Sequence, residues 1–542
     1  MTRRVRRDPV ESKFAWMQGD AHLGCIPAHD RSSSAGQHEA LRSVMLTASA
    51  NSARTVPLII LVTALLRLAL ASTLGLGVDE SYTTAISHQL ALSYFDHPPL
   101  HVWLVALVRF IDHENALCLR LPFIALFAGS TWLLFRITTD AYGDRAAFWA
   151  VVALNLTPLY TLGVASWVLP DGPLVFFSLL AVRLIVRALR APCSGAREFA
   201  GWSCAGLAAG LTLLSKYLAL LVFAGIALFL LTSRHRRALV SPALWLGALI
   251  AMLTFSPVIL WNAAHHWVSL RFQSMRILSG GFSVSRLLLD LAGQLVYLFP
   301  WTALMLLGAL GQALRGGSRD ECSWFFACVA LIPIALFALA PLWTAVLPHW
   351  PSIGWLFAFP LLGHLLATAE QKRQRLVHGA AYATGGVLII FVALLTSQAM
   401  SGWLTRVAPA FAAVDPTIEF FDWGGLKSAP ALQGLRRDGR FVATVSWMDA
   451  GKVSYALGSE PPVLCLSHDP RHFAFLHELR QFTGHDAIIV ADARRTDWVR
   501  LSAPYFERIE RLPPVVLRRA GVPALTLNIA RGIGFVDSSR TM

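Results

Sequence analysis

The sequence predicts an all-α polytopic membrane protein that carries a small soluble α/β domain at its C-terminus. Of its 542 residues, 55% are hydrophobic and only 14% are charged, and the mean hydropathy is +0.55. Ordinary soluble domains carry about 25% charged residues. Apolar runs of about 18 to 25 residues recur along most of the chain, and such runs are typical of transmembrane helices. The composition therefore argues against a series of soluble domains.

We expect about twelve membrane-spanning helices, give or take one. They are predicted near residues 56–76, 99–112, 117–137, 146–166, 172–190, 200–215, 217–232, 242–262, 286–312, 323–343, 349–368 and 380–399. Residues 1–55 contain no such run and mix arginine, serine, histidine and glycine. We expect them to form a disordered, basic cytoplasmic extension, with Met45 as an alternative start.

The pattern changes near residue 400, where a transmembrane domain over 56–400 gives way to a C-terminal domain over 401–542. Charged residues are dispersed in this second part, and short strand-like runs alternate with a helix-like segment. This alternation predicts a small α/β domain. The predicted strands are 440–448, 461–467, 486–492 and 522–530, and the predicted helix is 471–484.

The net charge of +14 is concentrated in short segments between the apolar runs. This placement follows the positive-inside rule for cytoplasmic loops and argues against nucleic-acid binding. The arginine-rich segments are 1–7, 183–197, 233–237, 313–319 and 370–375. The seven cysteines are scattered without a CxxC motif or a metal-binding spacing, so the sequence indicates neither a disulfide framework nor a zinc site.

If these basic loops are cytoplasmic, the polar segments between them lie together on the opposite face of the membrane. These segments are 78–104, 167–173, 215–217, 261–273, 347–355 and the C-terminal domain. The number of membrane crossings between Asp79 and Asp171 does not fit this arrangement. Three apolar segments separate Asp79 from Asp171, although a shared face requires an even number. Either segment 99–112 is re-entrant or one segment is divided wrongly.

Two pairs of ionisable residues near the first span are candidates for chemistry. Asp79 and Glu80 follow the span directly, and a charge at the bilayer centre costs roughly 2.5 kcal/mol or more. They are either functional or solvated beyond the end of the helix. Asp96 and His97 precede Pro98-Pro99, and proline is well suited to the first turn of a helix. Both side chains are thus expected beside the partial positive charge of a helix N-terminus.

Asp171 and Lys216 interrupt later apolar segments. Asp171 lies in a Pro-Asp-Gly-Pro turn, where a solvated turn residue is the simpler interpretation. Lys216 divides an apolar stretch that predicts two short helices joined by Ser215-Lys216-Tyr217. Its ammonium group either reaches toward water or binds a phosphate. Segment 261–273 contains both tryptophans and polar side chains. An aromatic belt at the membrane interface explains the tryptophans, but not the polar side chains among them. The sequence has no P-loop, dinucleotide-binding or H-E-x-x-H motif.

Taken in order, these motifs resemble the bacterial GT-C glycosyltransferases of family 39, the protein O-mannosyltransferase-like type related to the lipid A aminoarabinose transferase. The resemblance extends from residue 56 to about residue 400. It is carried by Asp79-Glu80, "YFDHPPLHVWL" (94–104), Asp171, "LLSKYLAL" (213–220) and "WNAAHHWVSLRFQ" (261–273).

The resemblance implies a multi-pass enzyme of the bacterial inner membrane with a GT-C fold and a periplasmic active site. It would transfer a sugar from a polyprenyl-phosphate donor to an envelope lipid, glycan or protein. The implied catalytic residues are Asp79 and Glu80, and a carboxylate would take the proton of the acceptor hydroxyl. The implied residues for the donor phosphate and sugar are Asp96, His97, Asp171, Lys216, Tyr217, His266 and Arg271.

Asp96-His97 replaces the acid-lysine pair of the aminoarabinose transferases, which leaves the donor sugar open. No cofactor is required by these motifs, although a divalent cation is compatible with them. Two alternatives stay open: a transporter or flippase of lipid-linked saccharide, and a non-catalytic assembly partner in the envelope. Substitution of Asp79 separates the three because it should abolish catalysis, alter transport at most and leave assembly intact.

Overall fold

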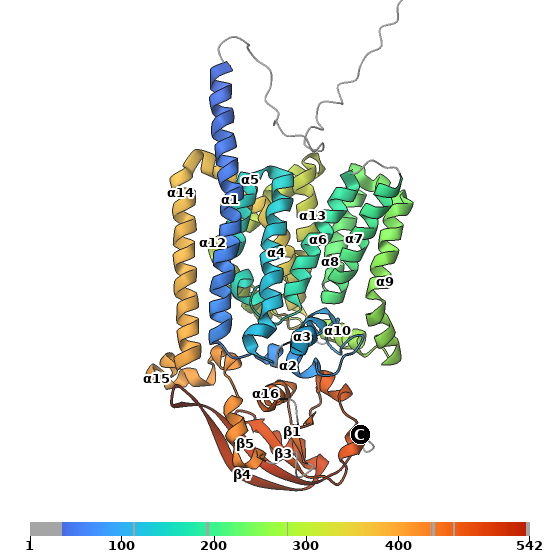
Figure 1. Cartoon of the computed structure of the whole chain (residues 1–542), viewed down its shortest axis with the longest axis vertical. Coiled ribbons are helices and arrows are strands. Elements are labelled where there is room, and N and C mark those ends of the chain that lie inside the picture. Colours follow the sequence, from blue (N-terminus) through green and yellow to red (C-terminus); the bar gives the residue numbers. More distant parts are fainter. Residues whose placement is uncertain are drawn as a thin grey trace, which may run out of the picture.

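A computed structural model of the chain describes residues 35–111, 114–190, 195–278, 280–433, 435, 440–458 and 461–537, with side chains from residue 54 onward except 276–278 and 413. A helical bundle stands on a small sheet domain (Figure 1). The longer helices are α1 (Ala35–Thr73), α4 (Ala116–Tyr142), α5 (Asp144–Asn155), α6 (Asp171–Arg190), α7 (Ala196–Ser215), α8 (Ala219–Thr232), α9 (Pro242–Ala264), α12 (Pro300–Gly316), α13 (Glu321–Leu339) and α14 (Ser352–Ser401). The others are α2 (Val78–Ile86), α3 (Leu100–Ile111), α10 (Val268–Leu278), α11 (Val284–Leu298), α15 (Trp403–Val407), α16 (Trp447–Leu457) and α17 (Trp498–Ser502).

The prediction of a multi-span helical protein is confirmed. Within the described residues, six helices are long and apolar enough to cross a membrane, or up to eight if each of two bent helix pairs counts as one span. The bent pairs are α8 with the 3-10 segment Arg234–Val240, at 112°, and α11 with α12, at 98°. Predicted spans 349–368 and 380–399 both fall within α14, which has a non-helical residue at Arg373 (φ −142°).

The first predicted segment begins earlier than expected. Helix α1 starts at Ala35 and so extends into the stretch 1–55, for which we predicted disorder. Residues 1–34 lie outside the described part of the chain.

Segment 99–112 is not a span. It forms the 12-residue helix α3, which lies with α2 and α10 at the lower end of the bundle (Figure 1). A helix of this length extends about 18 Å, too short for a hydrocarbon core of about 30 Å. Two segments then separate Asp79 from Asp171: α4, and the stretch 144–164, in which α5 is followed by the π-helical turn Leu159–Val164. Two crossings agree with the even number that a shared face requires.

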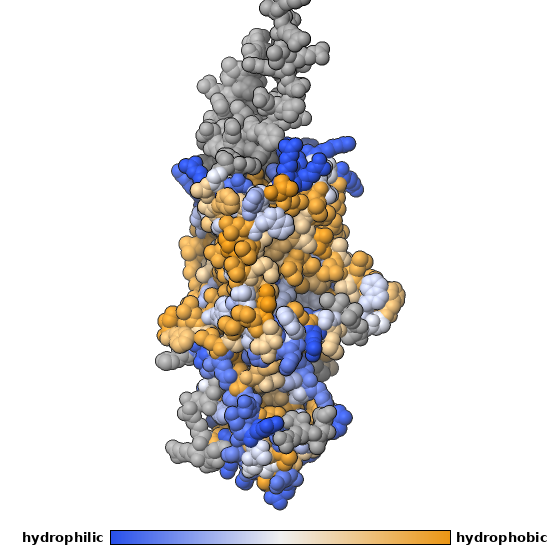
Figure 2. Space-filling view, turned by 90° about the vertical axis from the view of Figure 1, so that its right-hand side faces the viewer, coloured by the Kyte–Doolittle hydropathy of each residue, from blue (hydrophilic) through white to orange (hydrophobic). Residues whose placement is uncertain are grey.

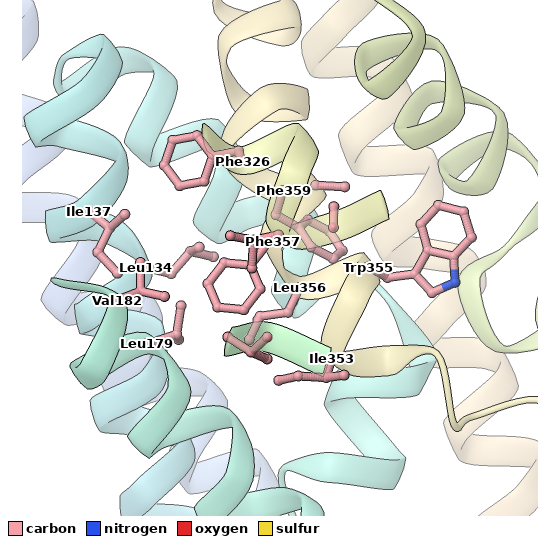
Figure 3. Packing of buried hydrophobic residues seen from close by; sticks show 14 of the residues in the cluster. Leu134, Ile137, Leu179, Val182, Phe326, Ile353, Trp355, Leu356, Phe357 and Phe359 are labelled. Carbon is pink, nitrogen blue, oxygen red and sulfur yellow. The ribbon is translucent and has the colours of Figure 1, made fainter. Parts of the chain in front are cut away.

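The bundle is apolar both inside and outside. Figure 3 shows its centre, where Leu134 of α4, Leu179 of α6, Phe326 of α13 and Phe357 of α14 meet. Its outer surface forms an apolar band with hydrophilic side chains at the upper end and over the C-terminal domain (Figure 2). Large apolar side chains are exposed in this band, such as Ile389 at 69%. An apolar exterior of this kind fits a lipid environment.

The C-terminal domain is a five-stranded mixed sheet in the order β2-β1-β3-β5-β4. Its strands are β1 (Phe441–Thr444), β2 (Val463–Cys465), β3 (Ala487–Asp492), β4 (Phe506–Arg519) and β5 (Val522–Phe535). Strand β1 pairs in parallel with β2 and β3, whereas β5 is antiparallel to β3 and β4. The four predicted strands are confirmed, and β4 and α16 were not predicted.

The predicted helix over 471–484 is wrong. Two 3-10 turns, Arg471–Phe475 and Leu479–Phe482, occupy that segment. The side chains of His472 and Phe473 are buried against Tyr94 and Tyr82, with ring centroids 4.7 and 5.9 Å apart. These contacts with segment 78–104 override the helical spacing of the apolar residues in 471–484.

The C-terminal domain is docked tightly on the lower end of the bundle. One hydrophobic core combines Tyr82, Tyr94 and Val102 with buried residues of the sheet domain. Helix α16 lies against α2 so closely that a Cβ on Gly451 would come within 2.8 Å of the backbone nitrogen of Tyr82. The Nζ of Lys452 donates to the backbone oxygens of Leu76 and Phe421. The lower end of the bundle and the sheet domain therefore form one packed unit.

Candidate active site

A cavity of about 280 Å³ lies where the bundle meets the C-terminal domain. Each of the polar segments that we predicted to share one face contributes to its wall. The lining residues are Asp79, Tyr82, Thr83, Asp96, His97, His101, Leu169, Pro170, Asp171, Lys216, Tyr217, Leu218, Gln273, Leu347, His349, Trp350, Trp447 and Arg471. A second cavity, of about 600 Å³, lies between α5, α12 and α14 and has no ionisable side chain in its lining. Of these two cavities, the one of about 280 Å³ is therefore the candidate for acid–base chemistry.

Asp79 has an available carboxylate in this cavity. It is the second residue of α2, and no described residue hydrogen-bonds its side chain. Asp79 is exposed to the cavity, and the protein atoms around the cavity remove part of its hydration. This desolvation, together with the negative charge of Asp96, raises the pKa of Asp79 to about 6. A carboxylate with that pKa is ionised at neutral pH and is still basic enough to accept a proton from a reacting hydroxyl.

Glu80, the other predicted catalytic acid, faces away from the cavity. Its carboxylate accepts hydrogen bonds from Arg120 at 2.6 and 2.8 Å and from the backbone N–H groups of Gly77 and Val168. Arg120 in turn donates to the backbone oxygens of Ala71, Leu74 and Gly75. Glu80 thus holds the end of α1, the start of α2 and α4 together, which is a structural role.

Lys216 and Asp171 form a buried ion pair on the cavity wall. The Nζ of Lys216 lies 2.9 and 2.8 Å from the two carboxylate oxygens of Asp171, and both residues are less than 10% exposed. The predicted pair of short helices is confirmed, because α7 ends at Ser215 and Lys216 takes an extended backbone conformation before α8. Asp171 begins α6, so the solvated-turn interpretation is wrong.

Asp96 is held by two side chains from different parts of the chain. Its Oδ1 accepts a hydrogen bond from the Tyr82 hydroxyl at 3.0 Å, and its Oδ2 forms an ion pair with Arg471 at 2.9 Å. Burial disfavours the carboxylate, but His97 and Arg471 outweigh this effect and hold the pKa of Asp96 below its usual value. Asp96 therefore remains ionised.

The histidines of the cavity are neutral near pH 7. Burial lowers the pKa of His97 to about 4, that of His101 to about 3 and that of His349 to about 4. His97, one of the residues implied for the donor phosphate and sugar, therefore offers hydrogen bonds rather than positive charge.

Tyr217 lines the cavity as predicted, but two other predicted binding residues do not. His266 and Arg271 are exposed and lie outside the lining. Helix α10 instead presents Gln273, whose side-chain nitrogen donates to the backbone oxygen of Asp96 at 2.8 Å. The sequence also gave no indication of Trp447 and Arg471, because both lie in the C-terminal domain. His349 and Trp350 lie in segment 347–355, which was singled out without a role for either residue.

Within the described ranges, no group of three or more His, Cys, Asp or Glu side chains is arranged to hold a metal ion. Two carboxylates of the cavity instead pair with cations, Asp171 with Lys216 and Asp96 with Arg471, whereas Asp79 has no such partner among the described residues.

Comparison with known proteins supports the resemblance expected from the sequence. A family model described as dolichyl-phosphate-mannose-protein mannosyltransferase matches residues 96–261, which include Asp96, His97, Asp171 and Lys216. An undecaprenyl phosphate-alpha-4-amino-4-deoxy-L-arabinose arabinosyl transferase from Pseudomonas aeruginosa is 28% identical over 326 residues. That alignment covers 58% of this chain and 57% of the relative, so the chain matches little more than half of the relative's length.

The fold is similar to that of a solved protein. ArnT from Cupriavidus metallidurans in the apo state superposes with a TM-score of 0.57 and 15% identity, over 88% of this chain and 98% of that one. The structure of the same protein bound to undecaprenyl phosphate superposes with a TM-score of 0.56 and 14% identity, over 87% and 97% of the two chains. The bundle and the C-terminal domain therefore follow an architecture that is already known.

Proposed function

We propose that this chain is a membrane glycosyltransferase that moves a sugar from a polyprenyl-phosphate donor to an envelope lipid, glycan or protein. The observation that carries the proposal is Asp79, a carboxylate without a hydrogen-bond partner among the described residues. Its cavity also holds the buried cation of Lys216 and the partly exposed cation of Arg471. The relative is named for the transfer of a sugar from undecaprenyl phosphate, and the structural neighbour is solved with that lipid phosphate bound.

The proposed reaction is a single displacement at the anomeric carbon of the sugar. The acceptor hydroxyl oxygen attacks this carbon while Asp79 takes the hydroxyl proton. The bond between the anomeric carbon and the phosphate oxygen breaks, and its electron pair leaves with the polyprenyl phosphate. A fixed positive charge near that oxygen stabilises the leaving group. Lys216 supplies one such charge from the cavity wall.

The remaining cavity groups fit the recognition of a sugar. Trp350 and Trp447 offer aromatic surfaces, and Tyr217, His97, His101 and His349 offer hydrogen-bonding groups without net charge. A mostly neutral, hydrogen-bonding lining suits hydroxylated rings, whereas the ionised Asp96 and Asp171 are occupied by their partners.

We also propose that the cavity faces the periplasm from the inner membrane. The arginine-rich segments near residues 183–190, 234–237 and 372–375 belong to the end of the bundle opposite the C-terminal domain (Figure 1). The positive-inside rule assigns that end to the cytoplasm. If each of the eleven other predicted segments crosses the bilayer, the odd number of crossings supports opposite sides for the start of α1 and the C-terminal domain.

The proposed domain organisation has three parts: the extension 1–55, the transmembrane catalytic domain 56–400 and the periplasmic α/β domain 401–542. The shared core around Tyr82 and Tyr94 makes the last two parts one functional unit. A transporter of lipid-linked saccharide remains the alternative, since it also requires charged groups within a membrane protein.

The experiment compares wild type with Asp79→Asn in detergent, using a labelled polyprenyl-phosphate sugar and an envelope lipid extract. Wild type is expected to release polyprenyl phosphate, and Asp79→Asn is expected to bind the donor and release none. Asp497→Asn is the control, because Asp497 is a half-exposed carboxylate of the C-terminal domain outside the cavity. Equal release by wild type and Asp79→Asn would remove Asp79 from the chemistry.

A further inference from the structure

The C-terminal domain contributes a charged side chain to the cavity of the membrane domain. Arg471 lies 375 residues from Asp96 in sequence, yet its NH1 atom is 2.9 Å from the Asp96 carboxylate. Its guanidinium carbon lies 4.4 Å from the ring of Trp447 and 5.1 Å from that of Phe272. The side chain is 17% exposed, so it is fixed in the wall and still reaches the cavity.

The backbone around Arg471 is held in an unusual conformation by contacts to the membrane domain. Arg471 has a φ of +52°, which is rare for a residue with a long side chain. Two hydrogen bonds to the membrane domain hold the next residue, His472. The backbone N–H of His472 donates to the Tyr82 hydroxyl at 3.1 Å, and its Nδ1 accepts from the backbone N–H of Phe95 at 3.2 Å. Backbone strain maintained by such contacts is typical of functional sites.

The guanidinium keeps donor capacity for a ligand. Its Nε donates to Asp469 at 3.1 Å and its NH1 to Asp96, while no described residue accepts from NH2. Lys216 differs, because both oxygens of Asp171 lie within 2.9 Å of its ammonium. Since the cavity histidines are neutral, Lys216 and Arg471 are the two cationic residues among the described lining residues.

We propose that Arg471 binds the phosphate of the lipid-linked donor, so that the C-terminal domain completes the active site. Arginine presents planar paired N–H donors that match phosphate oxygens, and it stays charged at all relevant pH values. Arg471 thus supplies a positive charge to the cavity, whereas the neutral His97 supplies none. The inference rests on the proposed function, because it assigns a residue to the donor of that reaction.

The test measures binding of a labelled polyprenyl phosphate without sugar to the full chain in detergent micelles. Arg471→Gln is expected to weaken binding about 10- to 100-fold, the loss of one charge-assisted contact. Arg471→Lys should recover only part of the affinity, because it keeps the charge but loses the planar pair of N–H donors. Arg480→Gln, a 70% exposed arginine of the same domain, should bind as wild type does.

A second variant separates phosphate binding from domain docking. Asp96→Asn removes the same ion pair but leaves the charge of Arg471, so it should retain or increase affinity for polyprenyl phosphate. Affinity unchanged in Arg471→Gln, or lost equally in Asp96→Asn and Arg471→Gln, would overturn the proposal. Failure of wild type to bind polyprenyl phosphate would instead overturn the proposed function and this inference with it.

Discussion

Asp79 and Glu80 are adjacent residues of α2 with opposite surroundings. The carboxylate of Asp79 opens into the cavity without a partner among the described residues, whereas Glu80 is 2% exposed and bound by Arg120 at 2.6 and 2.8 Å. Successive helical residues point about 100° apart, so one short helix presents one acid for chemistry and one for structure.

Glu80→Gln is therefore expected to reduce stability more than specific activity. Removing one charge leaves Arg120 buried without its counter-ion, which costs about 3 kcal/mol or more. The apparent Tm of the purified protein should fall, while the folded fraction keeps most of its turnover. Glu507→Gln, at an exposed carboxylate, should change stability by less than about 0.5 kcal/mol. Full stability with lost turnover in Glu80→Gln would assign this acid to the chemistry after all.

The pH dependence of turnover should report the Asp79 carboxylate. Its pKa is raised to about 6, so the base form is present above that pH and is lost as the pH falls through it. We expect kcat/KM to fall about tenfold per pH unit below pH 6 and to level off above it. The measurement is an initial-rate profile from pH 5 to pH 8. Equal rates at pH 5 and pH 7 would contradict the assignment.

Lys216→Met should abolish transfer and also destabilise the protein, because it leaves Asp171 as a buried, unpaired charge. The expected loss of stability is about 3 to 5 kcal/mol. The double variant Lys216→Met/Asp171→Leu removes both charges and should regain much of that stability without regaining activity. Thermal unfolding and product release, measured on wild type and both variants, separate the two effects. Transfer restored in the double variant would show that the ion pair is only structural.

Gly451→Ala tests the contact between the two domains. The added Cβ would lie 2.8 Å from the backbone nitrogen of Tyr82, so α16 must move away from α2. We expect lower turnover and faster proteolytic release of the C-terminal domain, with the bundle still folded. Gly308→Ala is the matched control, because a Cβ there meets no atom within 4 Å. Wild-type turnover and protease resistance in Gly451→Ala would mean that tight docking is not needed for activity.

The local pattern of the sequence predicted a substantial part of this structure. Apolar runs predicted the bundle, short strand-like runs predicted four strands of the C-terminal domain, and the distribution of arginine grouped the polar segments that line the cavity. Lys216 was identified because a lone ammonium in an apolar stretch needs a partner or water. Each of these signals depends on residues that are close in sequence.

The missed features depend on residues far apart in sequence. Arg120 neutralises Glu80 from 40 residues away, and Arg471 reaches Asp96 across 375 residues. The neutral state of His97 follows from burial that only the assembled cavity creates. The segment beginning at Arg471 has helical spacing, but its docking against Tyr82 and Tyr94 decides its conformation.

The most direct test of the proposed transfer is the mass of the acceptor. Protein reconstituted in liposomes with a labelled polyprenyl-phosphate sugar and envelope lipid extract would be analysed by mass spectrometry. We predict that wild type yields an acceptor that carries the labelled sugar and that Asp79→Asn binds the donor but yields none. Movement of intact donor across the bilayer with no new glycosidic bond would contradict the proposal and favour a transporter.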